Sequence, residues 1–529
     1  MQPVSNRNGY HGKSPLYLSN LFHPSAKYST CVLLIFLVIC WSSCREDFEF
    51  EPNSGNLEFS KDTVFLDTVF TNIGSSTYTL KVYNGLNEDI SIPFVGLQGG
   101  TDSSYRLNVD GVAGKEFTNV PLLARDSLFV FVETTFDVAP TGENQFLNTD
   151  RILFGEGTAQ QRVELVTLVK DAVFLFPRTL SDGTRETIPI GPDEAGDEIL
   201  VEGFFLEPQE LNFENTKPYV IYGYAAVPSG STLSIDPGAR VHFHADSGIW
   251  VDSGASIQIN GALSEDQEIL ENEVIFEGDR LEPTFADIPG QWGALWIRRG
   301  STNNSMDHLT LKNATVGLLV EGDLTNPDPT LTLNKVQVFN NLEYNFWGTN
   351  ARVTAFNSIF GGAGNTSFLI GSGGDYQLVH CTLANHWNRG PRRGNTLTID
   401  NFQADLERAD FVNCIVDGSS RLELALFQEP GQLFNFQFSN TAIKFEDTNG
   451  SFDNDPRYDF ENGSLYQNIL LNGTMDFERP AQNQFQIGPN SEVIDLGNPV
   501  SLPQVPTDIL GTARDNDPDA GAYEFDDQN

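Results

Sequence analysis

The sequence LTLKNATV at Leu309–Val316 is followed 22 positions later by the similar sequence LTLNKVQV at Leu331–Val338. A second pair, SGSTLSI at Ser229–Ile235 and SGASIQI at Ser253–Ile259, is separated by 24 positions. A β-rich unit of this length cannot bury its apolar face alone and must stack on its neighbours. Leucine-rich repeats share the period, but their characteristic Leu and Asn frame is absent. The repeats therefore predict a parallel-stranded solenoid of roughly nine coils, each about 4.8 Å thick.

A third, looser series supports the same prediction. Its four short segments are Asn357–Phe360, His380–Leu383, Asn413–Val416 and Asn440–Ile443. We expect the Asn side chains to occupy a recurrent turn and to form hydrogen bonds between coils. Cys381 and Cys414 occupy equivalent places in this series, so we predict two buried, inward-facing free thiols. A disulfide between them is the alternative if their coils are adjacent.

The residues before the repeats have a different pattern. From Leu57 to about Leu175 the chain consists of short β-patterned runs separated by Gly, Asn and Asp. Such spacing without a helical period is typical of an antiparallel β-sandwich. This stretch resembles the immunoglobulin-like (Ig-like) modules that precede repeats in surface lipoproteins, and we assign the sandwich to 57–176. Residues 177–215 are rich in Pro, Gly and Asp and are predicted to form a linker.

The repeat region also resembles a known family. The resemblance rests on four motifs: VPSG at Val227–Gly230, IDPGA at Ile235–Ala239, PGQWG at Pro289–Gly293 and a closing segment that ends in DAGAYE at Asp519–Glu524. These motifs are similar to those of lipoproteins with a right-handed parallel β-helix of the pectate-lyase-like type. The resemblance implies that 216–529 forms such a β-helix with a C-terminal closing segment. It implies no activity, because this fold hosts lyases, hydrolases, adhesins and inert scaffolds.

The first 56 residues predict where the protein resides. An apolar run at Cys31–Trp41 is too short to span a bilayer, and residues 1–43 contain no Asp or Glu. Cys44 follows two serines and resembles the acylated first residue of a bacterial lipoprotein. Arg45, Glu46 and Asp47 resemble the signal that moves Bacteroidetes-type lipoproteins to the cell surface. We therefore assign 1–43 to a signal peptide and 44–56 to an acidic tether, with outer-membrane lipid as the first partner.

The charge of the chain excludes one class of partner. The formal net charge is −41, and it becomes −44 when the three cations of residues 1–43 are removed. A surface this acidic repels phosphate backbones, so we expect no nucleic-acid partner.

Catalytic and metal signatures are weak. Galacturonase-like hydrolysis requires clustered carboxylates, and the Asp-Asp, Gly-His-Gly and Arg-x-Lys signatures of that family are absent from the repeats. Arg298 and Arg299 could serve a lyase, but outward structural arginines are the simpler interpretation. Asp515, Asp517, Asp519 and Asp526 have partial calcium-loop spacing, although Gly521 stands one place late. We predict no cofactor and no metal site.

One segment is basic in an otherwise acidic chain. His386, Trp387, Arg389, Arg392 and Arg393 lie within nine residues, in an insertion between the repeats of Cys381 and Cys414. We predict a loop that projects from the solenoid. Arginines can bind carboxylate or sulfate groups and Trp387 can stack on a sugar, so the loop is a candidate site for an anionic polysaccharide. The alternative is a solvated loop whose arginines pair with nearby acids.

Together these features favour a non-catalytic, surface-anchored lipoprotein that binds glycans or another surface protein. Two alternatives remain. The first is a polysaccharide lyase or hydrolase whose acids are assembled across coils. The second is an accessory subunit of an outer-membrane complex.

Replacing Cys44 with Ala should abolish retention in the membrane fraction, because the acyl chains would have no attachment point. Replacing Glu46 and Asp47 with Ala should leave the protein membrane-bound but facing inward. Membrane fractionation measures the first effect, and protease treatment of intact cells followed by immunoblotting measures the second. Protease resistance of the unaltered protein would contradict the predicted surface exposure.

Overall fold

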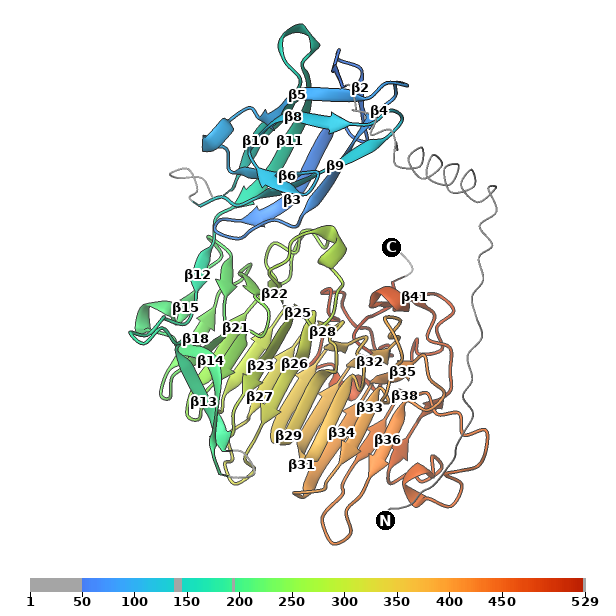
Figure 1. Cartoon of the computed structure of the whole chain (residues 1–529). Coiled ribbons are helices and arrows are strands. Elements are labelled where there is room, and N and C mark those ends of the chain that lie inside the picture. The colour runs from blue at the N-terminus through green and yellow to red at the C-terminus, as the bar shows by residue number, and fades with distance from the viewer. Residues whose placement is uncertain (1–49, 138–144, 193–195, 527–529) are drawn as a thin grey trace, which may run out of the picture.

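The computed structural model describes residues 50–137, 145–192 and 196–526, which form an all-β protein in several sheets (Figure 1). These residues contain no α-helix, and therefore no helix long and apolar enough to cross a membrane. The predicted signal peptide and the residues Cys44, Arg45, Glu46 and Asp47 lie outside the described residues. Short 3-10 helices occur at Gly100–Asp102, Gly157–Ala159, Pro208–Glu210, Pro283–Phe285, Pro456–Tyr458, Pro480–Gln482 and Pro499–Ser501.

The N-terminal unit consists of two sheets that enclose one apolar core. Alternating residues such as Leu80 and Val82 in one sheet and Ile152 and Val163 in the other are fully buried. Most pairings are antiparallel as predicted, but β1–β5 and β3–β11 are parallel. One sheet contains β1 (Glu51–Pro52), β3 (Thr63–Phe70), β5 (Ile90–Leu97), β8 (Glu116–Leu122), β10 (Gln145–Phe154) and β11 (Gln161–Lys170). The other contains β2 (Leu57–Phe59), β4 (Tyr78–Asn84), β6 (Tyr105–Val109), β7 (Val112–Gly114) and β9 (Ser127–Thr134).

The rest of the chain forms a parallel unit in which each strand pairs with a strand about one repeat away. The first of its two long sheets has eleven strands, all in parallel pairs. They are β12 (Val173–Leu175), β16 (Tyr219–Ile221), β19 (Arg240–Phe243), β22 (Val274–Gly278), β25 (Leu309–Lys312), β28 (Gln337–Phe339), β30 (Ile359–Phe360), β32 (Thr382–Asn385), β35 (Ile415–Gly418), β38 (Ala442–Ile443) and β40 (Leu470–Leu471).

The second long sheet has eighteen strands. Its first pair, β13–β14, is an antiparallel hairpin, and its other pairings are parallel. The strands are β13 (Thr187–Pro192), β14 (Glu198–Phe205), β15 (Asn212–Phe213), β17 (Tyr224–Val227), β18 (Thr232–Ile235), β20 (Gly248–Val251), β21 (Ser256–Asn260), β23 (Trp292–Ile297), β24 (Asn304–Asp307), β26 (Ala314–Glu321), β27 (Leu331–Asn334), β29 (Tyr344–Phe356), β31 (Phe368–Val379), β33 (Leu397–Asp400), β34 (Leu406–Val412), β36 (Leu424–Phe427), β37 (Gln437–Ser439) and β39 (Tyr466–Gln467). A small hairpin, β41 (Phe477–Arg479) and β42 (Gln484–Ile487), follows.

The path of the chain alternates between the two long sheets. After β16 the chain forms β17 and β18 in the larger sheet and then returns to the smaller sheet as β19. Because β17 pairs with β20 and β18 with β21, the larger sheet carries two parallel ladders. One pass through the three ladders is called a coil below. The inward side chains of all coils form one continuous core.

The sequence repeats predict the register of the strands only in part. The 24-residue repeat is confirmed, because Leu233 pairs with Ile257, and the third series is confirmed by the pairing of Thr382 with Ile415. The 22-residue repeat is wrong as a register. Leu309 lies in β25 of the smaller sheet, whereas Leu331 lies in β27 of the larger sheet. The two segments look alike because both alternate inward apolar and outward polar residues, not because they occupy equivalent places.

The boundaries of the units also differ from those predicted. β12 starts at Val173, inside the predicted sandwich, and already pairs with β16 of the parallel unit. The predicted linker at 177–215 contains β13, β14 and β15, which join the larger sheet. Its Pro and Gly residues therefore mark the turns of a hairpin and of the first coil, and the parallel unit begins at Val173 rather than at residue 216.

A left-handed residue recurs at one corner of the coils. Asn357, His380, Asn413 and Asn440 have φ between 46° and 54°, a region that Asn tolerates better than most residues. Their backbone N–H groups bond to the next coil, as in Asn357 N to Val379 O at 3.1 Å. The predicted bridge between coils is present at Asn413, whose Nδ2 lies 2.9 Å from Nε2 of His380 in the adjacent coil. The Asn side chains also donate to the C-terminal segment, for example Asn440 Nδ2 to Leu496 O at 3.0 Å.

The C-terminal segment, residues 472–526, follows the last strand of the smaller sheet and covers the outer face of that sheet. Ile359 and Ala384 of that sheet pack against Ile509 and Ala522, and a neighbouring cluster continues this contact along the sheet. A buried ion pair holds the segment together, with Arg514 Nη1 at 2.8 Å from Glu524 Oε2. Arg514 Nη2 also donates to Asn357 Oδ1 at 2.9 Å, which fastens the segment to the corner.

The two thiols are buried and unbridged, as predicted. Cys381 and Cys414 stack in adjacent coils, and the Cys381 N–H lies 3.4 Å from Cys414 Sγ. Burial raises the pKa of the Cys414 thiol, so this side chain stays protonated and behaves as a small apolar residue.

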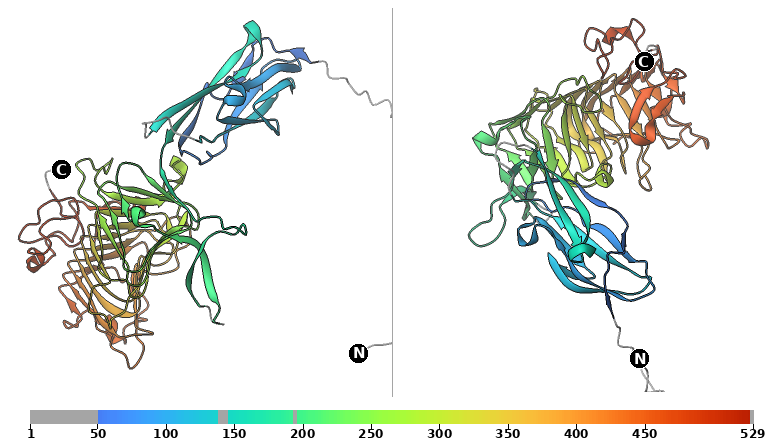
Figure 2. Two further views of the ribbon diagram at one scale, coloured as in Figure 1. Left: turned by 90° about the vertical axis from the view of Figure 1, so that its left-hand side faces the viewer. Right: turned by 90° about the horizontal axis from the view of Figure 1, so that it is seen from above.

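The two units touch beside β12 (Figures 1 and 2). Phe70 of β3 packs on the buried ring of His242 in β19, with ring centroids 4.9 Å apart. Arg280 Nη2 donates to Ser76 Oγ at 2.5 Å, and Ser76 also bonds to Glu282. Polar and aromatic contacts therefore set the angle between the units.

Candidate functional site

The basic segment lies between β32 and β33 and forms one wall of a cavity of about 740 Å³. Three other parts of the chain complete it: the turn at Asp287, the corner near Asn340 and Gly362, and the C-terminal segment before β42. The lining residues are Asp287, Phe339, Asn340, Gly362, His386, Trp387, Asn388, Arg389, Ala481, Gln482, Asn483 and Gln484. Because these parts are far apart in sequence, only the folded coils bring them together.

Arg392 does not point into this cavity. Its guanidinium lies 2.7 Å from both carboxylate oxygens of Glu423, and these side chains are 6% and 0% exposed. Arg392 Nη1 also donates to Asn385 O at 2.5 Å. A buried, hydrogen-bonded ion pair of this kind is structural, so the prediction that Arg392 binds an external anion is wrong. The loop folds back on the sheet instead of projecting freely along its whole length.

The other two arginines also have acidic partners. Arg389 Nη2 lies 3.3 Å from Asp287 Oδ2 at the mouth of the cavity. Arg393 pairs with Glu343, and its side chain is 65% exposed. Carboxylates of the protein itself therefore neutralise the positive charge of the loop. This agrees with the alternative interpretation, a solvated loop whose arginines pair with nearby acids. The site that remains is polar but nearly uncharged.

His386 and Trp387 line the cavity side by side in the sequence. His386 Nε2 is 3.1 Å from Asp417 Oδ2, and its ring lies 6.2 Å from the ring of Phe485. Asp417 therefore fixes the orientation of the imidazole. The position of Trp387 depends on a glycine, since a Cβ at Gly364 would lie 3.3 Å from its Cζ2 and 2.1 Å from Leu342 O.

Several side-chain amides also line the cavity. Asn388 Nδ2 donates to Ala481 O at 3.0 Å, which ties the loop to the C-terminal segment. Asn483 Oδ1 accepts a bond from Gly362 N at 2.7 Å. Gln484 Oε1 is buried and has no hydrogen-bond partner among the described residues. An unpaired buried carbonyl oxygen is unfavourable, and the side chain that carries this one lines the cavity.

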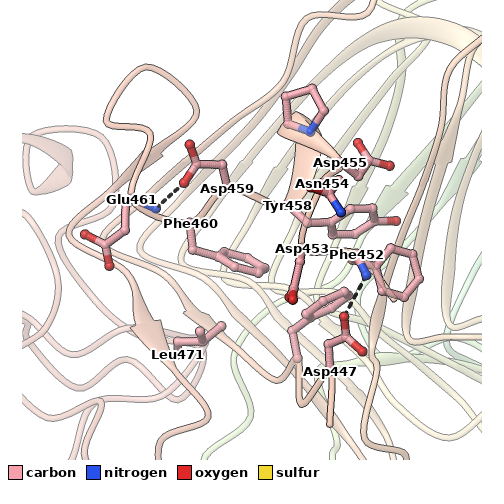
Figure 3. A pocket seen from close by; sticks show the side chains of 12 residues that line it. Asp447, Phe452, Asp453, Asn454, Asp455, Tyr458, Asp459, Phe460, Glu461 and Leu471 are labelled. Atoms are coloured by element: carbon pink, nitrogen blue, oxygen red, sulfur yellow. Dashed lines mark hydrogen bonds between the residues drawn. The ribbon is translucent and has the colours of Figure 1, made fainter. Parts of the chain in front are cut away.

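A second cavity, of about 600 Å³, lies at the end of the parallel unit and is rich in carboxylates (Figure 3). Asp455 accepts bonds from Arg457, which hold the pKa of this carboxyl below its usual range. Asp447 accepts a bond from Phe452 N at 2.7 Å. These contacts are local to the turns of 445–461, and the aromatic rings pack on the last coil. We interpret this region as the structural end of the core.

Neither the tail acids nor the candidate lyase arginines form a site. Asp519 accepts backbone N–H bonds from Asp495 at 2.9 Å and from Phe525 at 2.6 Å, so it closes turns of the C-terminal segment. Arg298 pairs with Glu321 at 2.9 Å and Arg299 with Asp323 at 3.2 Å. Within residues 50–137, 145–192 and 196–526, no group of three or more His, Cys, Asp or Glu could hold a metal ion.

The amides and Asp287 were not predicted as site residues. Asp287, Asn388, Gln482 and Gln484 have no motif in the sequence, because they come from three separate parts of the chain. The length of the insertion between Cys381 and Cys414 was the one feature of the sequence that indicated this site. It identified the loop but not the residues that line the cavity with it.

Comparisons with known proteins add little. No protein-family model matches the chain, and no curated protein matches it. Among solved structures, the catalytic domain of a GH87 alpha-1,3-glucanase in complex with tetrasaccharides aligns at 10% identity and a TM-score of 0.23, over 70% of this chain and 82% of the other. A PapD-like domain of human CEP192 aligns at 11% identity and a TM-score of 0.16, over 30% of this chain and 97% of the other. Likenesses this weak carry no argument about activity or partners.

Replacing Arg392 with Ala should lower the free energy of unfolding by about 3 kcal/mol, because Glu423 would remain buried without its partner. Changing Glu423 to Gln in the same chain should restore part of the loss. The matched control is Arg393→Ala, which removes an exposed pair and should leave the melting temperature nearly unchanged. Equal effects of the two single changes, measured by thermal and chemical unfolding, would contradict a structural role for Arg392.

Proposed function

We propose that the protein is a surface lipoprotein in which an Ig-like sandwich carries a right-handed parallel β-helix. The alternating path through three parallel ladders supports the β-helix, and the two sheets around one core support the sandwich. The resemblance of Cys44 and the acids after it to a lipoprotein export signal supports the location. In this arrangement the sandwich separates the β-helix from the membrane.

The proposed activity is non-catalytic binding of a glycan in the cavity beside the basic segment. The observation that carries this proposal is a cavity of about 740 Å³ that combines an indole, several amides and one unpaired buried carboxamide oxygen. The face of Trp387 offers apolar contact to a sugar ring, and the amides offer donors and acceptors to its hydroxyls. Such a mixture is typical of a small-ligand site with few fixed polar groups.

The charge balance favours a neutral glycan over the anionic one that the sequence suggested. Each of the three arginines already has a carboxylate partner, so an anionic ligand would meet compensated cations and the like charges of Asp287 and Glu343. A neutral sugar meets no such repulsion. Its binding should therefore depend little on ionic strength.

The enzymatic alternative is less well supported by this cavity. Glycoside hydrolysis by the usual mechanism uses two carboxyl groups, and Asp287 is the one carboxylate among the lining residues. Asp287 is also engaged in an ion pair with Arg389. The second alternative, an accessory role in an outer-membrane complex, is tested by co-purification from solubilised membranes.

Two variants on one strand separate binding from stability. Gln484 and Gln486 both lie on β42 and both have a buried Oε1 without a partner, but only Gln484 lines the cavity. Gln484→Met should weaken binding of a neutral oligosaccharide about fivefold, because one hydrogen bond is lost. Gln486→Met should leave binding unchanged. Trp387→Ala should weaken binding by up to about tenfold through lost stacking.

Calorimetric titration against panels of neutral and acidic oligosaccharides measures these effects. The neutral-glycan proposal predicts that affinity changes little between low and high salt. Binding restricted to acidic polysaccharides and lost steeply with salt would contradict it, and turnover of any oligosaccharide would favour the enzymatic alternative.

A further inference from the structure

A row of aromatic and aliphatic side chains runs along the outer face of the larger sheet. Trp250, Trp296, Leu319 and Trp347 are consecutive partners in the parallel ladder of β20, β23, β26 and β29. Three of the six tryptophans of the chain therefore lie in this row. Trp250 is buried, whereas the other three members are partly exposed.

The buried end of the row shows how this face holds a cation. Ile188 and Val201 of the β13–β14 hairpin pack over Trp250. The guanidinium of Arg298 lies 4.2 Å from the Trp250 ring centroid, and its Nε donates to Glu321 Oε2 at 2.9 Å. An aromatic face and a carboxylate thus hold one arginine of the protein itself.

A cavity of about 480 Å³ next to this arginine offers the same two kinds of group. It is lined by Val201, Glu202, Tyr224, Asp246, Gly293, Ala294, Trp296, Thr315, Val316 and Leu319. Two glycines leave room for the Tyr224 ring. A Cβ at Gly293 would lie 2.2 Å from Tyr224 Oη, and one at Gly248 would lie 2.6 Å from Tyr224 Cε1. No Lys, Arg or His is among these lining residues.

The carboxylates at the rim are poorly compensated. Glu202 is 3.9 Å from Arg185, and both side chains are about half exposed. Asp246 has no ion-pair partner in the part of the chain that the structure describes, although His244 lies close enough to feel its charge. Burial and the charge of Asp246 raise the pKa of Tyr224 to about 12, so the phenol stays neutral and adds no negative charge.

We propose that this cavity binds an arginine side chain from an exposed segment of a partner protein. The guanidinium would lie against Tyr224 and Trp296 and bond to Glu202 and Asp246, as Arg298 lies against Trp250 and bonds to Glu321. Charge complementarity selects this occupant, because an anionic ligand is repelled by both carboxylates and a neutral one leaves them uncompensated. Aromatic residues and arginine are also the commonest anchors of protein interfaces. This inference concerns a different surface from the proposed glycan cavity.

The test uses the purified whole protein and short blocked peptides in which glycines flank one arginine. Quenching or a shift of tryptophan fluorescence, supported by calorimetry, reports binding beside Trp296. The arginine peptide should bind, and its citrulline counterpart, which has the same shape without the charge, should bind at least about tenfold more weakly. Binding should also weaken as salt rises, because the rim carboxylates are exposed.

Two double variants distinguish a site from general acidity. Glu202→Gln with Asp246→Asn should lower the affinity for the arginine peptide about tenfold. The control pair is Glu198→Gln with Asp252→Asn, which removes the same charge from β14 and from the turn after β20 but outside the cavity. The control should bind like the unaltered protein.

Several outcomes would overturn the proposal. They are equal binding of the arginine and citrulline peptides, equal losses in the two double variants, and no binding to the unaltered protein at millimolar peptide. If a neutral oligosaccharide quenched Trp296 while the peptide did not, the face would be a glycan platform instead.

One further outcome would support the proposal. Loss of oligosaccharide binding in Gln484→Met with retained peptide binding would show that the two sites are separate.

Discussion

Parallel hydrogen bonding between successive coils is the interaction on which the rest of the structure depends. A single coil contributes two or three short strands and cannot bury its own apolar residues, so it gains a core only by stacking on its neighbours. In-register stacking then aligns equivalent positions along the molecule. The column of Cys381 and Cys414 and the outer row of tryptophans both follow from this alignment. The left-handed corner residues preserve it, because each turns the chain sharply and still donates its backbone N–H to the next coil.

Stacking alone would leave the apolar outer face of the smaller sheet exposed to water, and the C-terminal segment covers that face. The outer face of the smaller sheet carries apolar residues such as Ile359 and Ile415, and the segment covers them while its Arg514–Glu524 pair stays buried. The same segment brings Ala481 to Gln484 against the basic loop. The candidate glycan cavity is thus a by-product of covering the sheet, and its shape should depend on how firmly the segment is held.

The sequence predicted the kind of structure better than its details. Alternating apolar residues at Ser229–Ile235 and Ser253–Ile259 gave the correct class of strand and the correct register. The same alternation misplaced Leu331, because inward and outward residues alternate alike in all three ladders. Pro and Gly in 177–215 indicated a linker although they belong to hairpin and coil turns. The charge of Arg392 suggested a ligand site, but its buried partner Glu423 stands 31 positions away and became visible only in the fold.

Hydrogen exchange on the whole chain carrying Arg514→Met tests directly whether Arg514 holds the C-terminal segment on the coils. If Arg514 holds the segment on the coils, amide protection at 507–525 and in β30, β32 and β35 should fall on the order of a hundredfold. The matched change Arg479→Met, which removes an exposed pair on β41, should alter little. Unchanged protection in the Arg514 variant would contradict the account, because the segment would then stay on the coils without the buried ion pair that is said to hold it.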